Sequence, residues 1–187
     1  MRRAYGRMGW GLLFVLVDFK LDSVDMLPDT LGYLMIASGL WRLQKLNGYF
    51  KAGHLSAWLL MAWSVLPLFW FTEAGIDGLP PVQSAKDVWI QLPALCLHTV
   101  LIYGICRGIE AHFAGNASGL DHKASFRMHL FMAGQLLWLI VYPFVLNLDS
   151  GDMFLVFILC SLIVMAAEIA VLLLVRLAAR EGIEIKE

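Results

Sequence analysis

The chain has 187 residues, of which 60% are hydrophobic and 16% are charged, and its mean hydropathy is +0.72. Soluble domains usually have about 25% charged residues, so this composition excludes an ordinary soluble domain and predicts one membrane-embedded domain over residues 1–187. The three cysteines lie in apolar runs without paired spacing, which indicates neither a disulfide framework nor a zinc site.

Six apolar segments follow one another along the chain, and we interpret each as a membrane-spanning helix. A spanning helix needs roughly 20 residues, with about 17 to 25 tolerated. The first two segments are the shortest, so the first hairpin either spans the membrane or re-enters it and returns. The sequence therefore predicts an all-α integral membrane bundle of six transmembrane helices in three hairpins. The expected spans are residues 8–24, 28–43, 55–71, 88–106, 126–146 and 153–177.

Four aspartates lie where the first span leads into the second, namely Asp18, Asp22, Asp25 and Asp29. Their spacing would place the carboxylates on one stripe of an unbroken helix. Pro28 instead predicts that a new helix begins there, with Asp29 in its first turn. Asp22, Asp25 and Asp29 then form an acidic cluster at the outer face, either as solvated charges or, alternatively, as oxygen ligands for a divalent cation. Asp18 either lines an outward-facing cavity or pairs with a cation such as Lys86.

Lysine and arginine are distributed unevenly between the two sides of the six expected spans. Of the 14 basic residues, all but Lys20 and Lys86 fall in segments on one side. Because loops rich in lysine and arginine stay in the cytoplasm, we expect both termini to be cytoplasmic. The acidic loops then lie on the outer face.

Four polar residues lie deep within the expected spans. Counted at about 1.5 Å per residue from the basic edge, Asp18 lies roughly 16 Å deep, His98 roughly 13 Å, and Gln135 and Glu168 about 12 Å. A carboxylate at such depth costs about 2.5 to 3.5 kcal/mol on insertion scales, so it is expected to face the bundle interior and find a partner. For Glu168, the expected partner is Gln135 or His98. We predict that these four residues line a substrate or proton pathway; the alternative is that they only hold helices together.

Motifs for enzymes, cofactors and nucleic acids are absent from the sequence. There is no GxSxG, HExxH, P-loop or dinucleotide fingerprint, so we predict no catalytic residues and no cofactor. The spacing of His112, His122 and His129 matches no zinc signature. No basic stripe exists outside the membrane edges, which argues against a nucleic-acid partner.

The segment DMLPDTLGYLMIASGLWRL, residues 25–43, resembles the N-terminal hairpin of small multi-pass bacterial membrane proteins that share an LPD-xx-GY pattern. The pattern is matched by Leu27, Pro28, Asp29, Gly32 and Tyr33, and the segment covers about a tenth of the chain. This resemblance implies a bacterial plasma membrane location and no particular activity. The size and topology are also similar to the substrate-binding subunits of energy-coupling-factor vitamin importers. However, Gly6, Gly9 and Gly11 do not match the docking motif of their first helix, so this analogy concerns the fold only.

The sequence favours a transport or permeation protein for a small solute or ion, with the mid-membrane polar residues below an acidic outer face. The alternative is a non-catalytic subunit or regulator that binds a partner membrane protein or a second copy of the chain. An intramembrane enzyme that uses the first-hairpin aspartates with a divalent metal is a third possibility. The small-residue pairs Gly104 with Gly108 and Ala166 with Ala170 suit close helix packing, within the chain or between subunits.

Overall fold

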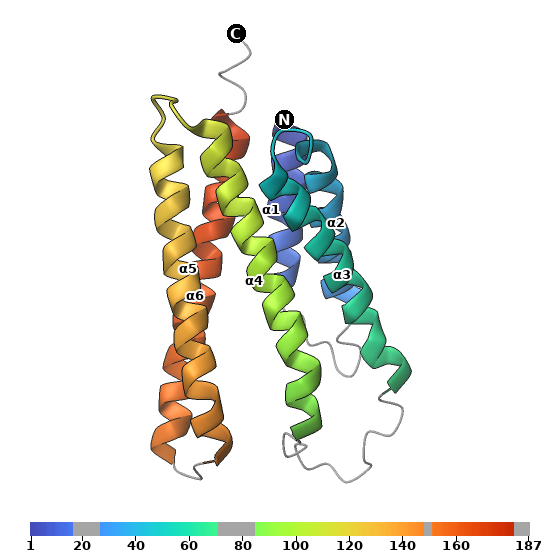
Figure 1. Ribbon diagram of the computed structural model, residues 1–187, viewed down its shortest axis with the longest axis vertical. Helices are drawn as coiled ribbons and strands as arrows, with labels where there is room; N and C mark the ends of the chain where they lie inside the picture. Colours follow the sequence, from blue (N-terminus) through green and yellow to red (C-terminus); the bar gives the residue numbers. More distant parts are fainter. Residues whose placement is uncertain (17–26, 71–84, 148–150, 182–187) are drawn as a thin grey trace.

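The computed structural model describes residues 1–16, 27–70, 85–147 and 151–181 (Figure 1). These residues form six α-helices, so the prediction of an all-α chain is confirmed for them. The predictions for Asp18, Asp22 and Asp25 lie outside the described residues. The helices are α1 (Arg2–Leu16), α2 (Leu27–Leu43), α3 (Gly48–Trp70), α4 (Ala85–Phe113), α5 (Leu120–Asn147) and α6 (Gly151–Glu181).

Helix α2 begins where the proline predicts it. Leu27 is its first residue, Pro28 its second, and Asp29 lies in the first turn. Proline fits there because the first N–H groups of a helix have no helical acceptor, and a carboxylate suits the positive end of the helix dipole. The later helices extend beyond their apolar segments. Helix α4, for example, runs from Ala85 to Phe113, because polar ends can continue a helix outside the hydrocarbon layer.

The prediction of six membrane spans is confirmed for three helices of the described chain. Within the described residues, three helices are long and apolar enough to cross a membrane, at Leu92–Phe113, Leu120–Val141 and Ile158–Glu181. Helices α1 and α2 have 15 and 17 residues. At about 1.5 Å per residue they fall short of a hydrocarbon layer of about 30 Å. Figure 1 shows both helices ending partway along the longer α4, α5 and α6.

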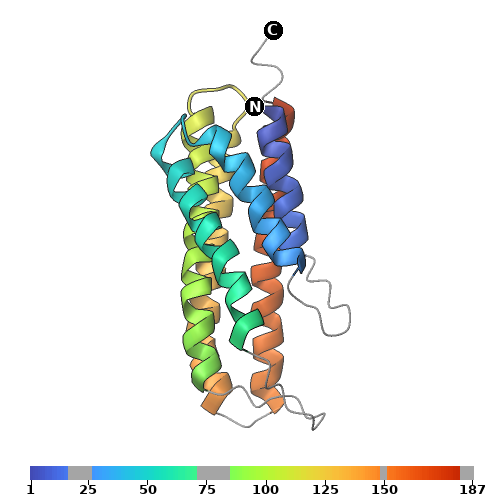
Figure 2. The same ribbon diagram turned by 90° about the vertical axis from the view of Figure 1, so that its right-hand side faces the viewer.

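The six helices close into a ring in chain order. Each helix contacts the next, α6 also contacts α1, and α4 contacts α6. Figures 1 and 2 show the chain start and the end of α6 at the same end of the bundle. Apart from Lys86 at the start of α4, the lysine and arginine residues of the described chain lie towards this end, so we call it the basic end.

The core is densest at the basic end. The fully buried ring of Tyr5 lies 6.4 Å, centroid to centroid, from both Phe50 and Phe113, which joins α1, α3 and α4. Asn47 caps α3 by accepting a hydrogen bond from the Phe50 N–H at 3.1 Å, and its own amide donates to the Gly108 carbonyl at 3.0 Å. This end of the bundle is therefore fixed by apolar packing and by a polar bridge between α3 and α4.

The small-residue pair at the end of α4 packs within the chain. A Cβ atom placed on Gly104 would lie 2.8 Å from both the Gly53 nitrogen and the Tyr49 carbonyl oxygen of α3. Gly108 faces the Phe50 ring in the same way. These glycines let α3 and α4 approach closely. They are occupied inside one chain, so they do not indicate a contact between subunits.

The Gly104→Ala substitution is expected to destabilise the protein by about 1 to 3 kcal/mol, because the added methyl group would meet backbone atoms that cannot rotate away. The matched control is Gly6→Ala, since a Cβ on Gly6 of α1 would meet nothing within 4 Å. We expect the control to be neutral or slightly stabilising, because alanine favours helix. Unfolding midpoints in mixed micelles measure both, and equal midpoints for the two variants would contradict the tight α3 and α4 contact.

Candidate functional site

His98 of α4 and Glu168 of α6 meet inside the bundle. The His98 Nε2 atom lies 3.1 Å from the Glu168 Oε1 atom, and the side chains are 13% and 23% exposed. An ionised carboxylate only accepts hydrogen bonds, so with an ionised Glu168 the proton lies on Nε2 of His98. The pair therefore has one shared hydrogen bond, which is strengthened when either partner is charged.

Neighbouring contacts hold this pair in position. The ring of Phe131, which is buried on α5, lies 6.0 Å from the His98 ring. Arg127 of α5 donates a hydrogen bond of 2.8 Å to the carbonyl of Ala170, two residues after Glu168. Helix α5 thus packs against the imidazole and is tied to the carboxylate's own helix. A pair held from three helices is preorganised rather than a chance contact between mobile side chains.

The pair opens onto a cavity of about 380 Å³. Five helices contribute to its walls, all except α3. A second and much smaller space of about 10 Å³ adjoins the same pair, and Leu12, Leu16 and Ile102 are among the residues that line it. The walls of the larger cavity are formed by Val15, Tyr33, Leu92, Ala94, Leu95, His98, Gln135, Trp138, Val164 and Glu168.

Gln135 of α5 offers unused hydrogen-bonding groups to this cavity. Its side chain lines the cavity and is only 8% exposed, and it makes no hydrogen bond to any described residue. A side-chain amide has two donors and one acceptor. A side-chain amide at a cavity wall that makes no hydrogen bond to a described residue is available to a ligand or to water.

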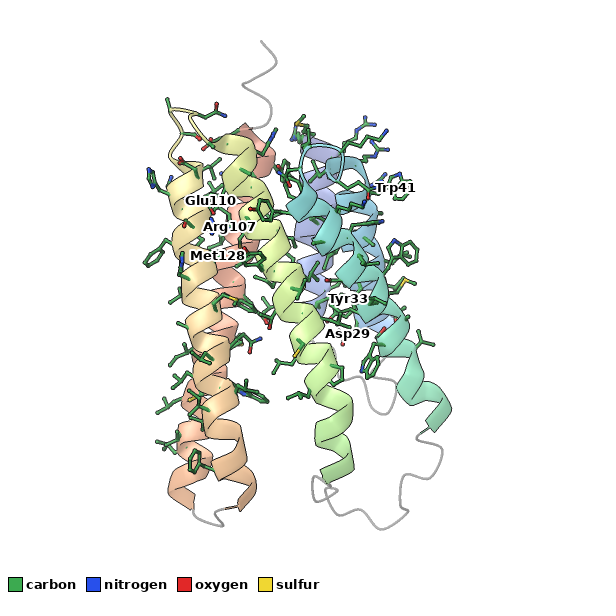
Figure 3. The ribbon with its side chains drawn as sticks, in the orientation of Figure 1. Asp29, Tyr33, Trp41, Arg107, Glu110 and Met128 are labelled. Atoms are coloured by element: carbon green, nitrogen blue, oxygen red, sulfur yellow. The ribbon has the colours of Figure 1, made fainter. Side chains whose placement is uncertain are left out.

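Two aromatic residues of the cavity were not among the residues predicted from the sequence. Tyr33 of α2 is 9% exposed and lies in the electrostatic field of both Asp29 and Glu168. Figure 3 shows Asp29 and Tyr33 on neighbouring turns of α2. The four-residue spacing of these two was a usable signal, since it places them on one helix face. Trp138 lies three residues after Gln135, a spacing that also places the two residues on one helix face.

The structure brings together three of the four residues predicted for the pathway. His98, Gln135 and Glu168 line the same cavity. Asp18 lies outside the described residues, as do Asp22 and Asp25 of the predicted acidic cluster. Asp29 lies in the first turn of α2 and is not one of the cavity-lining residues, although Tyr33 one turn later is.

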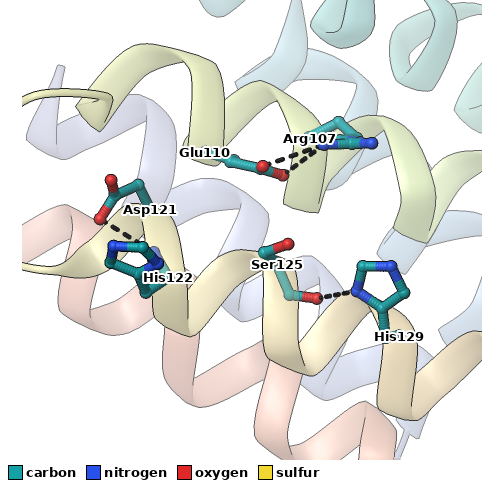
Figure 4. Close-up of polar contacts among 6 residues, drawn as sticks. All are labelled: Arg107, Glu110, Asp121, His122, Ser125 and His129. Atoms are coloured by element: carbon teal, nitrogen blue, oxygen red, sulfur yellow. Dashed lines mark hydrogen bonds and ion pairs between the residues drawn. The ribbon is translucent and has the colours of Figure 1, made fainter.

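Polar residues near the connection of α4 and α5 form separate local pairs (Figure 4). Arg107 donates to both carboxylate oxygens of Glu110, at 2.9 and 3.0 Å. The His122 N–H donates to Asp121 at 2.8 Å, and His129 Nδ1 lies 2.7 Å from a backbone carbonyl one turn earlier. In the part of the chain that the structure describes, no three His, Cys, Asp or Glu residues are placed to hold a metal ion.

A scan of protein-family models, a search of curated proteins and a search of solved structures find no match to this chain. Its chemistry is therefore inferred from the site. The cavity has mostly apolar walls, and a carboxylate, an imidazole and an amide are among its lining groups. Such a site can bind a small molecule through apolar contact and orient it through one polar group.

Proposed function

We propose that this chain is a small polytopic transport protein of the plasma membrane whose binding site is the cavity at His98, Gln135 and Glu168. One observation carries the proposal: polar side chains from α4, α5 and α6 converge on a single cavity of about 380 Å³ instead of dispersing into separate helix contacts. Ionisable groups inside a membrane bundle mark substrate or proton pathways. In this proposal all six helices lie in the membrane, the short first hairpin included, and the basic end faces the cytoplasm.

The walls of the cavity favour a small, mostly apolar molecule with one basic or hydrogen-bonding group. Binding pockets for small molecules commonly have volumes of about 300 to 1,000 Å³ and apolar linings with a few placed polar groups. Here Trp138, Val164 and Leu95 supply apolar surface. The carboxylate of Glu168 attracts a cation, while Gln135 pairs with a neutral donor or acceptor.

Movement of such a molecule requires a rearrangement at the His98 and Glu168 pair. Between this pair and the basic end the helices are closely packed, with Leu101, Ile105 and Val171 fully buried. A basic solute that bound Glu168 would compete with His98 for the same carboxylate. Breaking the bond between α4 and α6 would loosen the contact that closes the cavity, which is the kind of gating expected for alternating access.

Two probe molecules test the proposal: benzylamine, which has a basic group, and benzyl alcohol, which has a neutral one. We expect both to bind the purified protein, with the amine tighter, and to raise its unfolding temperature, because a ligand that binds only the folded state stabilises it. Vesicles containing the protein are expected to take up radiolabelled benzylamine faster than empty vesicles. If the protein bound neither probe and uptake matched that of empty vesicles, the proposed solute class would be wrong.

A further inference from the structure

Four arginines gather where α1 and α2 meet at the basic end. Arg2, Arg3 and Arg42 line a hollow of about 430 Å³, and Arg7 and Arg42 line a second hollow of about 270 Å³. We call these two hollows, which share Arg42, the arginine groove. No acidic residue lines either hollow. The ion pairs among the described residues, His98 with Glu168 and Arg107 with Glu110, involve none of these arginines.

An aromatic wall forms one side of the second hollow. Trp58 of α3 donates its indole N–H to His54 Nε2 at 3.2 Å, and His54 Nδ1 lies 3.0 Å from the Ala37 carbonyl of α2. The carbonyl can only accept and the indole can only donate, so the His54 proton lies on Nδ1. Trp41 packs on the same imidazole with ring centroids 5.3 Å apart. Trp41 is held by its ring contact from α2 to α3, and Trp58 by His54 of its own helix, which is itself bound to α2, so the wall is formed in advance.

The exposure of this wall suits the surface of a membrane. Trp41 is 61% exposed and Trp58 is 44% exposed. Figure 3 shows Trp41 on the outside of the bundle towards the basic end. Tryptophan rings prefer the level of the lipid headgroups, where one edge is apolar and the other is wet. The guanidinium groups beside them, which form no ion pair with a described residue, are then expected at the depth of lipid phosphates.

We propose that the arginine groove binds the phosphate headgroup of an anionic membrane phospholipid. Guanidinium groups pair with phosphate through two parallel hydrogen bonds, and a hollow lined by several arginines without carboxylates is complementary to such an anion. Basic pockets between helices at a membrane surface recognise anionic headgroups. This site is separate from the cavity at His98 and Glu168, with which it shares no lining residue, and it does not depend on the transport proposal.

Native mass spectrometry of the detergent-solubilised full chain, titrated with phosphatidylglycerol or phosphatidylcholine, tests this site. We expect phosphatidylglycerol to bind more tightly, and Arg7→Gln and Arg42→Gln each to weaken it about fivefold. Arg42→Lys keeps the charge but not the planar fork, so it is expected to lose less affinity than Arg42→Gln. The matched control is Arg180→Gln, which removes an exposed arginine of α6 that lines neither hollow. We expect its affinity to stay close to that of the unchanged protein.

Three outcomes would overturn the proposal. The first is equal binding of phosphatidylglycerol and phosphatidylcholine by the unchanged protein. The second is an equal effect of Arg180→Gln and Arg42→Gln, which would indicate attraction by overall charge and no defined groove. The third is displacement of phosphatidylglycerol by millimolar inorganic phosphate, which would indicate a site for a free anion. Circular dichroism of each variant confirms folding, and Arg7→Gln and Arg42→Gln test the second hollow from different helices.

Discussion

The Glu168→Gln substitution is expected to weaken benzylamine binding about 10- to 100-fold, because hydrogen bonds to a charged group contribute about 1.5 to 3 kcal/mol and each 1.4 kcal/mol is tenfold. Benzyl alcohol binding should change little, since the glutamine amide still offers a donor and an acceptor. The variant keeps the size of the side chain and a hydrogen bond to His98. Its stability should therefore fall by no more than about 1 kcal/mol. Isothermal titration calorimetry with both probes measures the affinities.

Glu110→Gln is the matched control for this measurement. Glu110 has a side-chain exposure of 24%, against 23% for Glu168, and it also accepts hydrogen bonds from a basic residue, Arg107. It lies three turns beyond His98 on α4 and does not line the cavity. We expect Glu110→Gln to leave both affinities unchanged. Equal benzylamine affinities for the two variants would show that the charge of Glu168 does not contact the ligand.

The helical fold follows from local signals in the sequence. Long apolar runs predict the helices, and Pro28 with Asp29 predicts where α2 begins. The membrane spans are harder to predict. A hydropathy average measures how apolar a segment is, but it does not show where the helix that contains the segment begins and ends. The first span was predicted at residues 8–24, and the structure describes α1 over Arg2–Leu16, so residues 17–24 of that span lie outside the described residues.

The sequence predicts how deep the site residues lie in the membrane, but not which way their side chains point. Counting residues from the basic edge placed His98, Gln135 and Glu168 at similar depths, and the structure places all three on one cavity. Depth does not say how each helix is rotated about its axis, so it could not decide whether Glu168 pairs with His98 or with Gln135. Rotation is set by packing, such as the contact of Phe131 with His98. Tyr33 and Trp138 were missed because an aromatic residue in an apolar run usually belongs to the core.

A substitution of an apolar residue can fill the cavity and leave its polar residues unchanged. Ala94 of α4 lines the cavity, so Ala94→Phe is expected to fill it and to reduce the affinity for benzylamine and for benzyl alcohol more than 100-fold. Filling an apolar cavity commonly stabilises a protein by about 0.5 to 2 kcal/mol, so the ligand-free variant should unfold at a higher temperature. Neither probe should raise that temperature further. Thermal unfolding with and without each probe measures all three effects.

Two further variants distinguish the loss of a binding site from an unspecific effect on the fold. Ala166→Phe is the matched control, because it adds the same ring to an exposed position of α6 outside the cavity, and it should leave both affinities intact. Val164→Phe fills the cavity from the α6 side and should reproduce the loss seen with Ala94→Phe. Glu168→Gln affects only the basic probe, whereas filling the cavity affects both probes. If Ala94→Phe and Val164→Phe both bound the probes normally, the ligand would lie elsewhere, and His98 and Glu168 would serve only to hold α4 against α6.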